Sequence, residues 1–130
     1  MVVYLSLAQV TDLQRRQLVR YGGLGGLRDR GALEAAVGRP QMTFGGEDLY
    51  PDVAAKAAAL LHSLVLNHPF IEGNKRAGAH AAALFLLANG VELTASAGAL
   101  ADITLATARG ELSAEELAIW FRQRSRAAGV

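Results

Sequence analysis

The sequence contains no cysteine. Disulfide bonds, a thiolate nucleophile and a zinc site with cysteine ligands are therefore excluded. A chain that needs no disulfide fits a reducing compartment, so we expect a cytoplasmic protein.

Strong charge of one sign is also missing. The formal net charge is +1, so no overall positive field is available to attract nucleic acid. The first residues carry no basic stretch before their apolar side chains, which predicts that there is no signal peptide. The longest apolar run is shorter than the roughly 20 residues of a membrane-spanning helix. We therefore expect neither a nucleic-acid partner nor a membrane.

Runs of β-branched residues are scarce, whereas the apolar fraction of 52% is rich in alanine. This composition favours helices that pack closely through small side chains. At 130 residues the chain is long enough for one domain with its own core, and it shows no internal repeat or linker. We predict an all-α fold, a compact single-domain bundle of about six helices over residues 1–130.

Start and stop signals divide the chain into these helices. Ser6 opens one capping-box pattern and Ser113 opens another. Asp29 is a candidate N-cap, and Pro51 suits a first helical turn. The predicted helices run from Ser6 to Gly22, from Asp29 to Gly38, from Pro51 to His68, from Asn74 to Gly90, from Thr94 or Ser96 to Gly110, and from Ser113 onwards.

The stretches between these helices lack a helical pattern. The glycine-rich turn region, residues 21–27, is typical of a flexible connection, and it is no P-loop because no Gly-Lys-Ser/Thr follows. Residues 39–50 are either a surface loop or a flap over the mouth of a site. Residues 91–94 are expected to form a short extended or turn segment. A solvated basic tail on the last helix is expected from Arg122, Arg124 and Arg126.

A dense polar stretch, His68 to Arg76 with the sequence HPFIEGNKR, stands directly before an almost wholly apolar run that ends at Leu87. We interpret it as a loop that delivers polar groups to the N-terminus of a buried central helix. A helix N-terminus carries unpaired N–H groups and a positive dipole end, which suit phosphate.

Each residue of this stretch suits a step in phosphate transfer. Histidine is the side chain that most often serves as a general base, so His68 can take this role. Glu72 is a hard oxygen ligand for Mg²⁺. The predicted phosphate-binding residues are Gly73, Asn74, Lys75 and Arg76. The alternative is a loop histidine and a surface ion pair between Glu72 and a neighbouring cation, which contributes little.

Two further histidines, His62 and His80, lie on the predicted helices on either side of this stretch. His80 lies one helical turn after Arg76 on the same face, so it either extends the binding wall or is a core histidine satisfied by a backbone carbonyl. His62 is expected to be structural. A zinc site of histidines with Glu72 is disfavoured because no compact pair such as His-Glu-x-x-His is present.

The stretch resembles the signature of the Fic/Doc superfamily, His-x-Phe-x-Asp/Glu-Gly/Ala-Asn-x-Arg. Lys75 stands where Fic adenylyltransferases carry glycine, which indicates the Doc (death-on-curing) branch. The likeness extends to residues 20–24, 38–39, 85–86, 89–90 and 110–113, and so covers nearly the whole chain. It implies that the glycine-rich turn is part of the family scaffold.

The resemblance implies a toxin that transfers the γ-phosphate of ATP, with Mg²⁺, to a threonine of elongation factor Tu and so blocks translation. His68 would be the general base, and Glu72 would hold the metal or help to orient the phosphates. Phosphate would be bound by Asn74, Lys75 and Arg76, with Gly73 in the anion-binding loop. His80 stands where Doc-like chains can carry asparagine, so it would take part in the nucleotide site. A cognate antitoxin would place its C-terminal segment in a groove of the toxin.

Two alternatives stay open on the sequence. One is transfer of AMP, but Ala79 stands where adenylyltransferases carry a second arginine. The other is a non-catalytic module that binds an antitoxin, against which the intact motif argues. The sequence shows no self-inhibitory Ser/Thr-x-x-x-Glu-Gly/Asn motif, so inhibition is expected from a separate chain.

Overall fold

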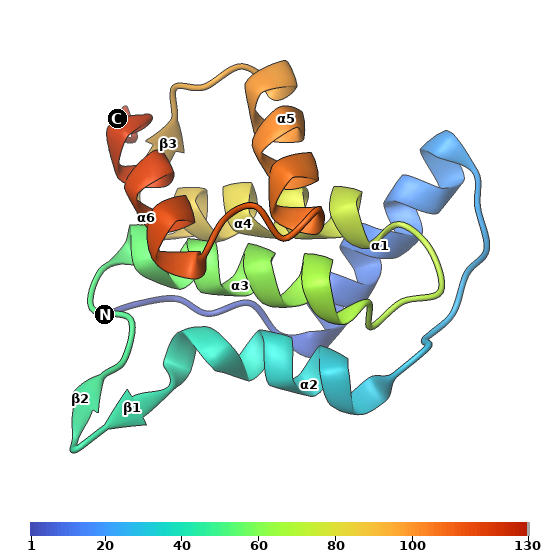
Figure 1. Cartoon of the computed structure of the whole chain (residues 1–130), viewed down its shortest axis with the longest axis horizontal. Helices are drawn as coiled ribbons and strands as arrows, with labels where there is room; N and C mark the ends of the chain where they lie inside the picture. Colours follow the sequence, from blue (N-terminus) through green and yellow to red (C-terminus); the bar gives the residue numbers. More distant parts are fainter. Residues whose placement is uncertain (130) are drawn as a thin grey trace.

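The computed structural model describes residues 1–129. Helices make up most of the chain and pack as a bundle (Figure 1). They are α1 (Leu7–Tyr21), α2 (Arg30–Gly38), α3 (Val53–Asn67), α4 (Asn74–Ala88), α5 (Ala97–Ala108) and α6 (Ala114–Gln123), with one 3₁₀ turn, η1 (Arg39–Gln41). Two short antiparallel pairs are formed by β1 (Thr43–Phe44) with β2 (Glu47–Asp48) and by β3 (Val91–Leu93) with β4 (Ser125–Ala127). The predicted all-α class is confirmed.

Most helix starts are fixed by a side chain that accepts a backbone N–H three residues further on. The five capping residues are Ser6, Asp29, Asp52, Ser96 and Ser113. Both predicted capping boxes are present. Pro51 lies just outside α3 rather than in its first turn, because the carboxylate of Asp52 bonds the Ala55 N–H at 2.7 Å and takes the N-cap position.

α3 is the most enclosed helix. Ten of its fifteen residues are buried, against seven of fifteen in α4. The sequence predicted that α4, the helix after the motif, is the buried central helix. Only one face of α4 is buried, and Leu84 and Leu87 are exposed. An apolar sequence run does not distinguish a face packed on the core from a face beside a cavity.

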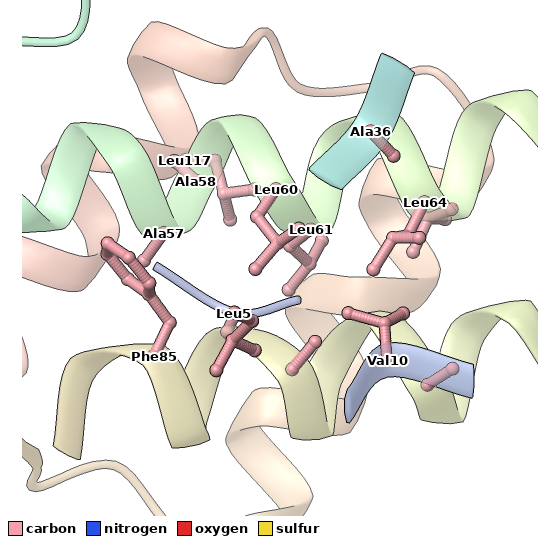
Figure 2. Close-up of a cluster of buried hydrophobic side chains, with 14 of the residues drawn as sticks. Leu5, Val10, Ala36, Ala57, Ala58, Leu60, Leu61, Leu64, Phe85 and Leu117 are labelled. Carbon is pink, nitrogen blue, oxygen red and sulfur yellow. The ribbon is translucent and has the colours of Figure 1, made fainter. Parts of the chain in front are cut away.

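The core lies between α3 and α4, with α1, α2 and α6 around it (Figure 2). Alanines such as Ala57 and Ala81 are fully buried and bring the two helices close together. A Cβ placed on Gly78 of α4 would lie 2.8 Å from Cγ2 of Val65 in α3. The close spacing of α3 and α4, the two helices that flank the motif, therefore depends on glycine at position 78.

Residues 39–50 are more regular than predicted. After η1, the β1–β2 hairpin is held at its base by Lys56, whose buried Nζ donates to Asp48 at 3.0 Å and to the Pro40 carbonyl at 3.2 Å. Lys56 lies in the first turns of α3, whereas the motif loop follows the far end of that helix (Figure 1). The hairpin is thus at the opposite end from the motif, and the flap alternative is wrong.

The basic tail is also more structured than predicted. α6 ends at Gln123, and Arg126 lies in β4, where it pairs with Glu92 of β3. Arg122 forms an ion pair with Asp52 at 2.6 Å, and the Arg124 guanidinium lies 4.9 Å from the centre of the Trp120 ring. These arginines tie the C-terminal part to the start of α3 and to β3 rather than serving solvation alone.

His62 has the structural surroundings that were predicted. Its Nδ1 lies 3.2 Å from Nη1 of Arg39, whose Nε donates to the Tyr50 hydroxyl at 2.7 Å. Partial burial, and next the charge of Arg39, lower the pKa of His62. In residues 1–129 no helix is long and apolar enough to cross a membrane.

Candidate functional site

The motif loop, residues 68–73, joins α3 to α4, and its first and last residues both have the left-handed backbone conformation. His68 is the C-cap of α3, with φ 46° and ψ 59°, and Gly73 precedes α4 with φ 80°. Phe70 is 1% exposed and anchors the loop in the core. The loop is therefore fixed in the middle and turns sharply at both ends.

Asn74 closes the loop from inside. Its Oδ1 accepts the Phe70 N–H and its Nδ2 donates to the Phe70 carbonyl, both at 3.0 Å. The side chain is only 8% exposed. Part of its hydrogen-bonding capacity is therefore used by the loop, and its binding of phosphate stays a prediction.

The glycine-rich turn region lies along the motif loop and is no free connection. The Ile71 N–H donates to the Gly26 carbonyl at 3.1 Å, and Leu27 forms an isolated antiparallel β-bridge with Phe70. The Leu24 N–H donates to Oε2 of Glu72 at 2.8 Å. A Cβ on Gly23 would lie 2.5 Å from that oxygen, so only glycine permits the approach. The turn region thus orients the carboxylate that was predicted to bind a metal.

α4 is the one α-helix in residues 1–129 that lacks a side-chain cap. Its N-cap is Gly73, which has no side chain, so the N–H groups of the first turn have no capping partner. Lys75 and Arg76 are exposed beside them. The Arg76 guanidinium stacks 4.2 Å from the centre of the Tyr21 ring. Unpaired N–H groups and two cations at a helix N-terminus form a site that favours an anion.

A cavity of about 870 Å³ opens beside this helix start. Its walls come from α1, the motif loop, α4 and α5. It is lined by Gln17, Tyr21, Ile71, Glu72, Gly73, Asn74, Lys75, Arg76, Ala79, His80, Ala83, Ala97, Leu100, Ala101, Thr104 and Leu105. The structure therefore brings together every predicted site residue except His68, which is exposed on the loop but does not line the cavity.

His80 is exposed and lines the cavity, so it is not a core histidine. Its contact with a ligand stays a prediction. Within residues 1–129 no three His, Asp or Glu side chains lie close enough together to hold a metal ion. Glu72 would accordingly be the single protein carboxylate available to a cation at this site.

Sequence reasoning missed the contribution of α1. Gln14 donates to the Glu72 carbonyl at 3.1 Å, and Gln17 lines the cavity. The side-chain amide oxygen of Gln17, Oε1, is buried and has no hydrogen-bond partner among the described residues. A buried polar oxygen of this kind is unfavourable unless a water or a ligand supplies a donor. The sequence did carry one signal, because Gln14 and Gln17 lie on the same face of the predicted helix as Tyr21. A search for charged motifs does not detect such a pair of glutamines.

Comparisons with known proteins identify the family of the chain. The model of the Fic/DOC family matches residues 4–86. The chain belongs to this family, in its Doc branch.

Two relatives illustrate the likeness. The protein named Toxin Doc of Mycolicibacterium smegmatis is 52% identical over 77 residues, which is 59% of this chain and 59% of that protein. The match therefore spans less than two thirds of that relative. The protein named Protein kinase doc of Escherichia phage P1 is 35% identical over 120 residues, covering 92% of this chain and 94% of that protein.

Proposed function

We propose that the chain is a Doc-like toxin that transfers the γ-phosphate of ATP to a hydroxyl group of a protein, and that the target is a threonine of elongation factor Tu. The observation that carries the proposal is the uncapped start of α4, which opens into a large cavity beside Lys75 and Arg76. Support also comes from the name of the phage P1 relative, which describes a protein kinase.

The cavity has a polar end and an apolar wall, as a nucleotide requires. Phosphates would lie against the first turn of α4, where N–H groups and cations meet. The base would lie along α5, where Leu100 and Leu105 face the cavity. A volume of about 870 Å³ falls within the range of small-molecule sites.

Mg²⁺ fits the donor set if the nucleotide supplies most of the ligands. Magnesium is commonly bound by one or two carboxylates together with substrate phosphates. The Glu72 carboxylate is exposed at the cavity, and only its Oε2 accepts a hydrogen bond from a described residue. When bound, the ion would neutralise charge on the phosphate oxygens.

His68 would act as the general base from outside the cavity. The threonine hydroxyl would approach over the motif loop, and its oxygen would form a bond to the γ-phosphorus while the bond to the β,γ-bridging oxygen breaks. The hydroxyl proton would pass to the imidazole, and ADP would leave. Lys75, Arg76 and the N–H groups of α4 would stabilise the charge on the transferred group.

Ala79 supports phosphate transfer over AMP transfer. It lines the cavity at the position where adenylyltransferases of the superfamily carry their second arginine. Without that cation, the cavity has less to hold the nucleotide in the orientation that exposes the α-phosphate. The proposal therefore favours the γ-phosphate as the transferred group.

We also propose a cytoplasmic toxin–antitoxin pair. The exposed Leu84 and Leu87 of α4 and Leu105 of α5 provide apolar surface next to the cavity. The C-terminal segment of an antitoxin that folds on binding would cover such a surface with its own apolar side chains. The site would then be closed by its partner.

The test uses purified chain, Mg²⁺, elongation factor Tu and ATP labelled at either the α- or the γ-phosphate. We expect label on the factor from γ-labelled ATP alone, and its loss by at least 100-fold in His68→Ala, in the range reported for removal of a general base. A factor whose acceptor threonine is replaced serves as control. Label from α-labelled ATP would establish AMP transfer, and full activity of His68→Ala would contradict the role of His68.

A further inference from the structure

His68 has an unusual backbone conformation. It is the only non-glycine residue in the described part of the chain with a positive φ. The left-handed region is unfavourable for a residue with a Cβ and persists only where the surroundings hold it. The contacts that hold this residue therefore decide where its imidazole points.

Arg28 supplies these contacts. Its Nε donates to the His68 carbonyl at 2.6 Å, and its Nη2 donates to the Asn67 carbonyl at 2.6 Å. Its backbone N–H donates to the Pro69 carbonyl at 2.8 Å. One residue thus engages three consecutive carbonyls, from the last residue of α3 into the motif loop.

The chemistry of these contacts suits their position. The last carbonyls of a helix lack intrahelical partners and carry the negative end of the dipole, so a cation there is favourable. The planar guanidinium presents two N–H groups in a fixed geometry, which sets the orientation of both carbonyls at once. Because Arg28 is exposed, the contacts act through this geometry rather than through burial.

The rest of the segment fixes the position of Arg28. The Asp29 N–H also donates to the Pro69 carbonyl, at 3.0 Å, and Asp29 caps α2. On the other side, Gly26 pairs with Ile71. Arg28 is therefore held in place by the capped start of α2 on one side and by the backbone hydrogen bond between Gly26 and Ile71 on the other.

We propose that Arg28 is a positioning residue that holds His68 in its left-handed conformation and so aims the imidazole at the accepting hydroxyl. This inference rests on the proposed role of His68 as the general base. Arg28 makes its contacts through backbone carbonyls and acts on the reaction only through His68.

The test compares Arg28→Ala, Arg28→Lys and the matched control Arg30→Ala. Arg30 lies two residues away, and within residues 1–129 its side chain pairs only with exposed Glu34. Because a displacement of about 1 Å can reduce a rate roughly 100-fold, we expect kcat to fall about 10- to 100-fold in Arg28→Ala. The KM for ATP should stay within about twofold, since the nucleotide residues are on α4 and α5. Arg28→Lys should recover part of kcat, and Arg30→Ala should match the unchanged chain.

A second measurement reads His68 directly. The ¹³Cα and ¹³Cβ chemical shifts of His68 report its backbone conformation, and we expect them to leave the left-handed range in Arg28→Ala. Unchanged shifts would overturn the proposal, and so would an unchanged kcat in a variant whose shifts have moved. If Arg28→Ala does not fold, Arg28→Lys provides the same comparison, because one ammonium group cannot reproduce the two-pronged contact.

The two proposals fail in different ways. If the folded chain without substitutions labels no protein, the proposed kinase activity is wrong. The role of Arg28 in holding the His68 backbone is tested independently, by the chemical shifts. Unchanged His68 shifts in both Arg28 variants, whatever the activity, would overturn the positioning role.

Discussion

At the scale of single residues, the motif shows that one side chain can serve the loop and the site together. The residue types from His68 to Arg76 indicated phosphate chemistry from the sequence. They did not indicate that Asn74 is bonded to both backbone groups of Phe70. Nor did they indicate that Glu72 is held by a backbone N–H 48 residues away. Such partners are set by tertiary contacts, and no local pattern records them.

Asn74→Ala should be costly for stability. It would leave the N–H and carbonyl of buried Phe70 without partners, which predicts a loss of about 1–3 kcal/mol in the free energy of unfolding. Urea denaturation would measure it. In the control Asn67→Ala, an exposed side chain loses one bond to Ser63, and we expect a change within about 0.5 kcal/mol. Equal losses in the two variants would contradict the bridging role of Asn74.

At the scale of elements, the sequence predicted helices well and short pairings poorly. Helix starts depend on residues within one turn, so Ser6 and Ser113 could be recognised as caps directly. The β1–β2 hairpin and the β3–β4 pair have only two or three residues in each strand. β3 and β4 are also separated by two helices in the sequence. Periodicity carries too little information over such lengths. The β1–β2 hairpin was therefore expected as an irregular segment and β4 as part of a helix, whereas β3 was expected as a short extended or turn segment without its partner strand.

The contact between α3 and α4 gives a prediction at this scale. Gly78→Ala should destabilise the chain by about 1–3 kcal/mol through overpacking, although alanine is the better helix former. The reason is that the new Cβ would lie 2.8 Å from stiff, buried Val65. Gly98→Ala in α5 is the control, since its Cβ would meet only Ser96 Oγ at 3.9 Å. There we expect a gain of up to about 1 kcal/mol. Thermal denaturation of both variants would measure the contrast, and a stabilised Gly78→Ala would refute the close packing.

At the scale of the whole molecule, the site is assembled from segments that lie far apart in the sequence. The glycine-rich turn, the motif loop and α5 meet only in the fold. The sequence identified the polar end of the cavity, because its residues are consecutive. It gave no indication of the α5 wall or of Gln17, because these depend on how α1 and α5 pack beside α4. The bonds of Arg28 were likewise hidden, since 40 residues separate it from His68.

His62 makes the stability of the molecule depend on pH. It links α3 to Arg39 of η1. Its pKa in the folded chain is lowered from 6.5, chiefly by burial, so the unfolded chain binds this proton more readily. The stabilising contribution of neutral His62 is therefore complete above pH 6.5 and is lost as the pH falls through the lower folded-state pKa.

Urea denaturation between about pH 5 and 8 would detect this effect. We expect the free energy of unfolding to fall toward acidic pH in the unchanged chain, and to fall less in His62→Gln, which retains a polar side chain but cannot titrate. His68 and His80 are present in both proteins, so the difference isolates His62. Parallel curves would mean that its protonation does not oppose folding.

The uncapped start of α4 has a consequence for how this site is inherited. Its donors are main-chain N–H groups, which every amino acid except proline provides. Random substitution therefore removes His68 readily but seldom removes the donors of the α4 turn. A lineage that abandons catalysis would keep a pocket able to bind an anion, and such a pocket is available for a new use.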